Sequence, residues 1–298
     1  MRARPSFEGV IPPVVTPFSL DGEVDLEGLE RQVSWLSGRG LAGILILGST
    51  GEAPLVDRDE RKAIIERAAA RKEEGTVLMA GTGAEGTRQT IQLSRDAAEA
   101  GADSVLVVNP SYYAGAMTVE GMSAHFEAVA DASPVPILLY TVPKFTNLAI
   151  PPAVVERLAR HENCVGIKDS SGDLCSLHTF MERTSPDFQV LTGSPLILGA
   201  AGAAGAAGGI LAVANLFPEL CIRLFEAGRQ GEVETLRTLQ TEVNVLTRRI
   251  QGAWGIPGLK VGADMLGGFG GYPRPPLRPL NGEGKAGVEA ALSEAGLL

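Results

Sequence analysis

Short apolar runs alternate with amphipathic segments over most of the chain. Residues 42–47 (AGILIL), 104–108 (SVLVV) and 136–140 (PILLY) are almost continuously apolar, which is typical of strands buried on both faces of a parallel sheet. The segments between such runs, for example 26–37 and 87–100, carry apolar residues at helical spacing. The pattern therefore predicts strands that are each followed by a covering helix.

Eight such strand-and-helix units follow one another along the chain. The predicted strands are 10–16, 42–47, 77–80, 104–108, 136–140, 164–167, 188–191 and 208–213. Eight units, with no G-x-G-x-x-G after the first strand, favour a closed barrel over a doubly wound sheet. We expect an α/β fold, a (β/α)8 TIM barrel over residues 1–228. Residues 229–298 are expected to form a C-terminal helical extension packed on the barrel, with helices at 233–250 and 288–297.

Composition narrows the class of protein. The net charge is -9, and an acidic surface without a basic cluster disfavours nucleic acid and anionic membranes as partners. No uninterrupted apolar stretch reaches the roughly 18 residues of a membrane span, and residues 1–10 lack the apolar core of a signal peptide. The three cysteines have neither CxxC nor metal-ligand spacing. We expect a cytoplasmic protein without a metal site.

Candidate chemistry gathers where the predicted strands end, which is where barrels carry their active sites. Lys168 is the only lysine at such a position. Burial by residues 164–167 would lower its pKa, and a neutral amine can form a Schiff base with a ketone. Tyr140 ends the neighbouring strand and could transfer protons. Local sequence leaves two alternatives open, a surface lysine that begins a loop and a tyrosine that caps the barrel core.

The loop GSTGE at residues 48–52 follows the second strand. The hydroxyl and backbone N–H groups of Ser49 and Thr50 could bind a carboxylate, although a plain turn would have similar residues. Glu52 is either a general base or a residue that holds the loop by hydrogen bonds. The loop is therefore a candidate anion-binding element of the predicted rim, with a plain turn as the alternative.

Four motifs in order, GSTGE, NPSYY, YTVP and GIKDSSGD, resemble the dihydrodipicolinate synthase / N-acetylneuraminate lyase family of class I aldolases. The resemblance covers essentially the whole chain. It implies that Lys168 is the Schiff-base lysine and that Tyr140 transfers protons beside it. It also implies that Ser49 and Thr50 bind the carboxylate of pyruvate, with Ser49 in a hydroxyl relay.

The resemblance further implies a role between subunits. Tyr113 matches a relay tyrosine that reaches the site of a neighbouring subunit, with Tyr112 as the alternative, so a homo-oligomer (dimer or tetramer) is expected. Ile210 matches a position whose backbone carbonyl lies near the amine. No metal or organic cofactor is implied, because the imine on Lys168 serves as the electron sink.

One departure bears on the second substrate. In dihydrodipicolinate synthases an arginine usually stands five positions after the catalytic tyrosine, whereas this chain has Phe145 there and Lys144 beside it. An aromatic ring cannot replace a bidentate guanidinium. The stretches SYYAGAMT, GAAGGILAVAN, GIPGLK and GGYPRPPL resemble the 4-hydroxy-2-oxoglutarate aldolases, in which the position of Ser170 helps to hold the distal carboxylate.

We therefore expect cleavage of 4-hydroxy-2-oxoglutarate to pyruvate and glyoxylate. The alternatives are 4-hydroxy-tetrahydrodipicolinate synthase and another 2-keto-3-deoxy acid aldolase or dehydratase of the family. A non-catalytic regulatory barrel that binds a keto acid is the alternative outside enzymes. It would predict the loss of Lys168 or Tyr140, and the chain keeps both.

Overall fold

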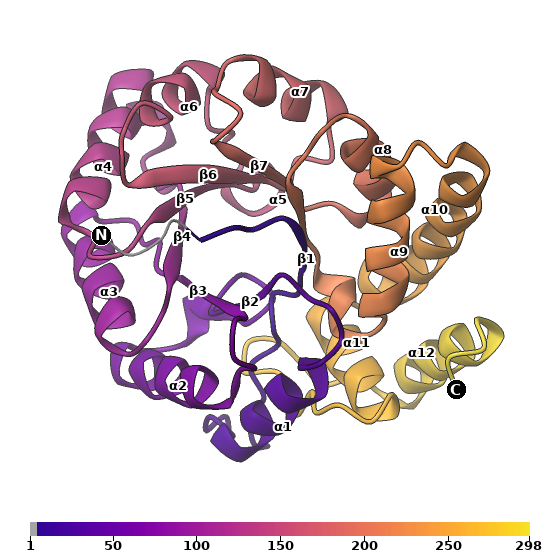
Figure 1. Ribbon diagram of the computed structural model, residues 1–298. Coiled ribbons are helices and arrows are strands. Elements are labelled where there is room, and N and C mark those ends of the chain that lie inside the picture. The colour runs from indigo at the N-terminus through magenta and orange to yellow at the C-terminus, as the bar shows by residue number, and fades with distance from the viewer. Residues whose placement is uncertain (1–4) are drawn as a thin grey trace.

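The computed structural model describes residues 5–298, and its centre is a ring of eight parallel strands (Figure 1). Each strand pairs with the next one along the chain from β2 to β8, and β8 pairs with β1. The predicted (β/α)8 barrel is thereby confirmed. The strands are β1 Gly9–Ile11, β2 Gly43–Ile46, β3 Val77–Gly81, β4 Ser104–Val108, β5 Ile137–Thr141, β6 Cys164–Asp169, β7 Gln189–Thr192 and β8 Gly208–Ile210.

The ring closes between β1 and β2 by a few irregular contacts. We predicted the first strand over 10–16, but β1 ends at Ile11 because prolines follow it and lack the N–H that a ladder needs. The chain continues beside β2 nonetheless. The amide of Leu45 donates to the Pro12 carbonyl at 3.0 Å, and the amide of Val14 donates to the Leu45 carbonyl at 2.7 Å.

Helices surround the ring on its outer side (Figure 1). Several begin at side-chain caps, of which Asp57 is the fullest example: its carboxylate accepts from the amides of Asp59 and Glu60, and Glu60 bonds back to the Asp57 amide. A short helix that we did not predict, α5, lies between β5 and α6. The helices are α1 Leu26–Leu36, α2 Arg58–Arg71, α3 Thr87–Glu99, α4 Val119–Ala132, α5 Pro143–Thr146, α6 Pro152–Leu158, α7 Leu174–Glu182, α8 Leu198–Ala203 and α9 Pro218–Arg229.

The strands are apolar on both faces because both faces are buried. Residues such as Leu45, Leu106 and Leu138 fill the inside of the barrel. Their neighbours Ile44 and Val105 belong to the larger cluster between the strands and the helices. Full burial of such a side chain is worth about 1.5–3 kcal/mol, so a polar residue on a strand needs a specific reason to be there.

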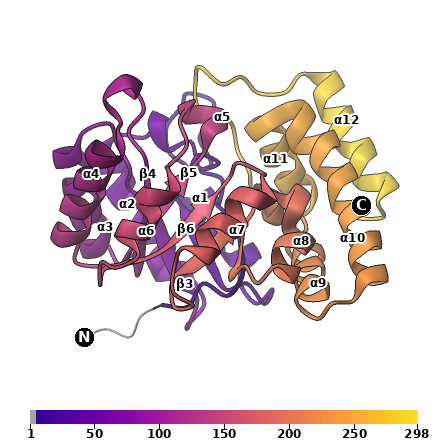
Figure 2. The ribbon, with the colours of Figure 1, turned by 90° about the horizontal axis from the view of Figure 1, so that it is seen from above.

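The C-terminal helices stand at one side of the barrel, next to α8 and α9 (Figures 1 and 2). They are α10 Val233–Thr247, α11 Ala253–Met265 and α12 Gly282–Glu294, with a π-helical turn at Arg248–Gly252 between α10 and α11. We predicted the last helix from residue 288, but it begins at Gly282 because Asn281 caps it. None of the helices within residues 5–298 is both long and apolar enough to cross a bilayer.

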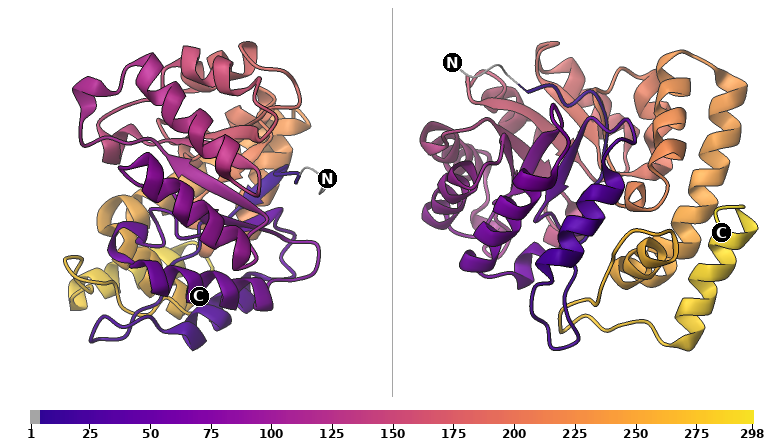
Figure 3. Two further views of the ribbon diagram at one scale, coloured as in Figure 1. Left: turned by 90° about the vertical axis from the view of Figure 1, so that its left-hand side faces the viewer. Right: turned by 60° about the horizontal axis from the view of Figure 1, so that its bottom comes forward.

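The extension shares a hydrophobic cluster with the barrel. Leu239, Leu246 and Leu292 pack in the same cluster as Val10 and Phe225, and Figure 3 shows the orange-to-yellow helices beside the strands. The boundary at residue 228 between barrel and extension remains a prediction. The packing matters for function because it brings the turn at 248–252 to the rim of the barrel.

Candidate active site

Lys168 is a buried strand residue. Strand β6 runs two residues further than we predicted, through Asp169, and places Lys168 opposite Tyr140 on β5. Lys168 is only 4% exposed, so it is not a surface lysine at the start of a loop. Burial lowers the pKa of this amine, an effect that its interaction with Tyr140 opposes.

Tyr140 connects Lys168 with the loop after β2. Lys168 Nζ lies 4.3 Å from the centroid of the Tyr140 ring. The Tyr140 hydroxyl lies 3.4 Å from Ser49 Oγ. An amine on β6, a phenol on β5 and an alcohol on the loop after β2 therefore follow one another, and the last two are close enough to exchange a proton after a small movement.

The loop GSTGE turns sharply and is held from behind. Leu47 and Glu52 have left-handed backbone, with φ of 55° and 58°. Thr16 Oγ1 donates to the Gly51 carbonyl at 2.8 Å. Glu52 Oε1 lies 2.6 Å from Lys260 Nζ, and Glu52 Oε2 accepts from the amide of Arg274 at 2.8 Å. Of the two roles that the sequence left open for Glu52, the geometry supports the one that holds the loop.

A cavity of about 670 Å³ lies over Lys168. Six of the seven predicted site residues line it, namely Ser49, Thr50, Tyr140, Lys168, Ser170 and Ile210. Its charged lining residues within the described chain are Lys144, Lys168 and Arg248, all cations. In a protein of net charge -9, such a lining gives the cavity a positive potential that suits an anionic ligand.

Gly193 leaves the space that Lys168 needs. A Cβ atom at this position would lie 1.8 Å from Ser170 Oγ, 2.8 Å from Ser170 Cβ and 3.1 Å from Lys168 Cε. Distances below 3.0 Å force the neighbours to move. Glycine at the end of β7 is therefore a requirement for the positions of both Lys168 and Ser170.

Tyr113 is the predicted site residue that lies apart from this cavity. Its side chain is 71% exposed and stacks edge-on against Tyr112, with ring centroids 5.1 Å apart. The loop is held by Glu85, whose carboxylate accepts from the amides of Ser111 and Tyr112 at 2.9 Å each. Within one chain, Tyr113 therefore contributes nothing to the surroundings of Lys168.

Sequence reasoning missed Lys260 and the π-helical turn. Lys260 stands in GIPGLK, where prolines and glycines obscure the helical pattern, and it is 0% exposed. Arg248 and Gln251 stand in what reads as the continuation of α10, yet both line the cavity. The sequence feature that could have pointed to this turn is the pair of arginines at 248–249, which stands out in an acidic chain. Among residues 5–298, no group of three His, Cys, Asp or Glu residues is placed to hold a metal ion.

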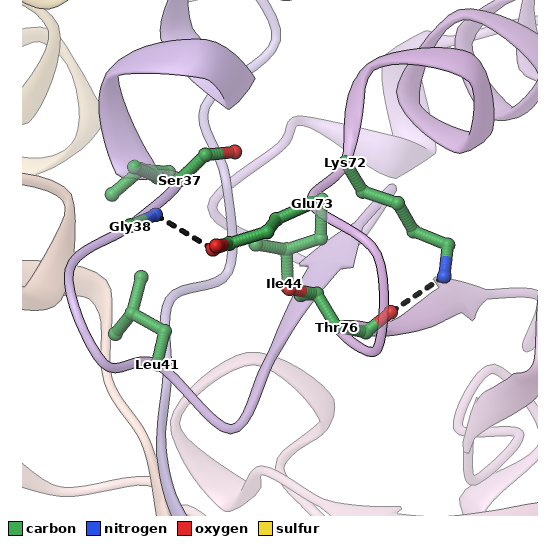
Figure 4. A pocket seen from close by; sticks show the side chains of 8 residues that line it. Ser37, Gly38, Leu41, Ile44, Lys72, Glu73 and Thr76 are labelled. Atoms are coloured by element: carbon green, nitrogen blue, oxygen red, sulfur yellow. Dashed lines mark hydrogen bonds between the residues drawn. The ribbon is translucent and has the colours of Figure 1, made fainter.

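A much smaller cavity lies away from the rim, between the end of α1 and the end of α2 (Figure 4). The amide of Gly38 donates to Glu73, and Lys72 Nζ donates to the Thr76 carbonyl at 2.6 Å. The space measures about 10 Å³, which is at the lower limit for one water molecule. It is a packing gap rather than a ligand site.

Comparison with known proteins places the chain in a family. The sequence profile of the Dihydrodipicolinate synthetase family matches residues 6–295. The chain belongs to this family. It is therefore a carbon–carbon lyase, as the sequence motifs predicted.

Relatives and solved structures of this family cover the chain almost completely. The 4-hydroxy-tetrahydrodipicolinate synthase of Methanothrix thermoacetophila is 35% identical over 97% of both chains, and that of Acidiphilium cryptum is 35% identical over 98% of this chain and 99% of its own. YagE, a prophage protein of the dihydrodipicolinic acid synthase family from E. coli K12, was solved in complex with pyruvate. It has a TM-score of 0.90 and 30% identity, covering 98% of this chain and 99% of its own. These relatives give no support to the 4-hydroxy-2-oxoglutarate aldolase branch, which remains a prediction.

Proposed function

We propose that Lys168 forms a Schiff base with a pyruvate-type 2-keto acid and that the chain makes or breaks a carbon–carbon bond next to that imine. The observation that carries this proposal is a lysine 4% exposed at the base of a cationic cavity, beside a phenol. Because burial disfavours the ammonium form, more of the amine is neutral and nucleophilic than in a solvated lysine.

The reaction follows from the amine. Lys168 Nζ attacks C2 of the keto acid, and the carbinolamine loses water to give a protonated imine. The imine draws electrons from C3, so that loss of a proton there gives an enamine, which can attack an aldehyde carbon. In the reverse direction the C3–C4 bond breaks, the aldehyde leaves, and the enamine is protonated and hydrolysed to the keto acid. The imine is the electron sink, so this chemistry requires no metal or organic cofactor.

The other predicted residues have roles that fit this scheme. Ser49 and Thr50 bind the carboxylate of the keto acid, and Tyr140 and Ser49 carry protons between bulk water and the reacting atoms. Ile210 lends its backbone carbonyl beside the amine, and Ser170 lies on the side of the second substrate. The pyruvate complex reported for YagE supports the choice of keto acid.

Tyr113 belongs to this scheme only if a second copy of the chain supplies it. Its exposure of 71% and its absence from the lining of its own cavity support a role across a subunit interface. Tyr112 is similarly exposed at 79% and remains the alternative. The functional unit we propose is therefore a homo-oligomer, in which the site of one subunit is completed by the partner.

Two reactions differ in the second substrate, the partner of the keto acid. The names of the relatives favour 4-hydroxy-tetrahydrodipicolinate synthase. One observation favours cleavage of 4-hydroxy-2-oxoglutarate instead: Phe145, which lines the cavity and is 60% exposed, stands where a synthase of the resembled type has an arginine. Phenylalanine has no group that could bind a carboxylate.

A paired turnover assay tests the proposal. Pyruvate release from 4-hydroxy-2-oxoglutarate is measured with a coupled lactate dehydrogenase, and condensation of pyruvate with aspartate semialdehyde is measured on the same preparation. Activity in either assay that is lost in Lys168→Ala supports the proposed lyase. Dominant condensation activity would overturn the interpretation of Phe145, and activity retained by Lys168→Ala would overturn the role of Lys168.

A further inference from the structure

The π-helical turn Arg248–Gly252 brings polar groups of the C-terminal region to the cavity over Lys168. Thr247, Arg248 and Gln251 all line that cavity, although they stand some eighty positions after the lysine in the sequence. A π-helical turn holds one residue more than an α-helical turn and occurs frequently at functional sites. Here it continues α10 with right-handed helical backbone, and the chain leaves that helical course only at Gly255, whose φ is 60° and ψ is -144°.

Two side-chain atoms, one on the last residue of α10 and one on the turn, are buried without a partner. Thr247 Oγ1 and Gln251 Oε1 make no hydrogen bond to any group of residues 5–298, and Thr247 is only 7% exposed. Leaving a buried polar atom unpaired costs about 1–3 kcal/mol. Since both residues line the cavity, a ligand there can supply the missing partners, a hydroxyl group for the Gln251 carbonyl and an acceptor for the Thr247 hydroxyl.

Arg248 is a free cation at the same place. Within residues 5–298 its guanidinium has no hydrogen-bond or ion-pair partner, although its backbone N–H bonds to carbonyls of α10, whereas the adjacent Arg249 pairs with Glu294. Lys144, which also lines the cavity, stands on α5 with its ammonium 5.9 Å from the Phe145 ring centroid. Of the two, the guanidinium has the planar geometry that binds a carboxylate through two parallel hydrogen bonds, and Arg248 lines the same cavity as Thr247 and Gln251.

We infer that Arg248, with Thr247 and Gln251, binds the distal end of a substrate that carries a second carboxylate and a hydroxyl group. The C-terminal region thus supplies the cation that is missing at Phe145. This inference rests on the proposed function, because it needs the first end of the substrate on Lys168. It extends that function in two ways. It names the substrate class, a dicarboxylic 2-keto acid, and it names residues outside the strands of the barrel that recognise this class.

Imine trapping with two matched keto acids tests this site. 2-Oxoglutarate and 2-oxopentanoate have the same chain length and differ in a terminal carboxylate or methyl group. Each is titrated with borohydride present, and the concentration that half-saturates labelling of Lys168 is measured by mass spectrometry. We expect wild-type protein to prefer 2-oxoglutarate. Arg248→Ala should raise its half-saturating concentration roughly tenfold to a hundredfold, the effect of losing a charge-assisted hydrogen bond, and leave 2-oxopentanoate unchanged.

The controls separate this inference from the proposed function. Arg249→Ala removes the neighbouring arginine, which pairs on the outside of the molecule, and should behave as wild type. Equal preference for the two acids in wild-type protein, or a loss that follows Lys144→Ala instead of Arg248→Ala, would overturn the role of Arg248. Labelling with pyruvate that persists in Arg248→Ala shows that Lys168 chemistry is intact, whereas wild-type protein that traps no keto acid refutes the proposed function itself.

Discussion

The ammonium of Lys260 lies 2.6 Å from the Glu52 carboxylate, and both side chains are fully buried. The same ammonium donates to the backbone carbonyls of Thr16 and Tyr272, at 2.7 and 2.6 Å. Burial lowers the pKa of Lys260 to about 8, an effect that Glu52 opposes, so the lysine is still mostly charged at neutral pH. The pair joins helix α11 of the extension to the loop that carries Ser49.

Removing one member of this pair should damage stability more than removing both. Glu52→Gln or Lys260→Met leaves an uncompensated buried charge, for which a loss of about 3–5 kcal/mol in the free energy of unfolding is expected. The double variant, which leaves no unpaired charge, should lose less than either single variant. Chemical denaturation of the four proteins measures this coupling, and strictly additive losses would show that the two side chains do not interact.

Gly193→Ala should disable Lys168 without unfolding the chain. The added methyl group overlaps Ser170 and approaches Lys168 Cε, and overpacking of this kind costs about 1–3 kcal/mol. We expect a folded protein whose labelling by pyruvate and borohydride falls at least about tenfold. Gly282→Ala is the matched control, because a Cβ there meets nothing within 4 Å. Normal labelling of Gly193→Ala would contradict the tight fit described at β7.

The rate of imine formation should depend on pH through Lys168. Only the neutral amine attacks, so the rate rises with pH and levels off above the pKa of Lys168, which burial holds below the usual 10.5. Because Tyr140 raises that pKa, Tyr140→Phe should move the midpoint to lower pH. The same variant should lose about 10²–10⁴-fold in turnover, since proton transfer is removed. Initial rates of borohydride labelling across pH measure the midpoint, and an unchanged midpoint in Tyr140→Phe would argue against contact between the two groups.

Tyr113 can be tested by mixing two inactive proteins. Lys168→Ala lacks the nucleophile and Tyr113→Phe lacks the proposed relay hydroxyl. If Tyr113 acts across an interface, a hybrid dimer has one complete site, and random mixing restores about a quarter of wild-type activity. Co-refolded mixtures are assayed for turnover against each protein alone. No recovery in mixtures that demonstrably contain hybrids would place Tyr113 outside the partner's site, and the experiment is then repeated with Tyr112→Phe.

The strand pattern could be predicted because it is local and repeated. AGILIL and SVLVV are buried on both faces, and each continuous apolar run marks one strand. Lys168 stands at the end of such a run, and its place at a strand end of the predicted barrel, rather than the local sequence, singled it out as a buried lysine. The bounds of β1 were wrong because prolines remove ladder donors without changing the apolar pattern.

The positions of Lys260 and of the turn at Arg248–Gly252 could not be predicted, since they depend on contacts or helix geometry that the local sequence pattern does not show. Lys260 is held by Thr16 and Glu52, more than two hundred positions away in the sequence. The turn at Arg248–Gly252 differs from an α-helix by one residue per turn, a difference that apolar spacing does not reveal. The proposed partner of Tyr113 belongs to another copy of the chain, which no pattern within one sequence can describe.

The central claim is that Lys168 is the nucleophile, and one measurement tests it most directly. The protein is incubated with pyruvate, reduced with borohydride, digested and analysed by mass spectrometry. We predict one reduced pyruvyl group on the peptide that contains Lys168, and none in Lys168→Ala. Unlabelled Lys168 under saturating pyruvate, or equal labelling of Lys168→Ala at another lysine such as Lys144 or Lys260, would contradict it.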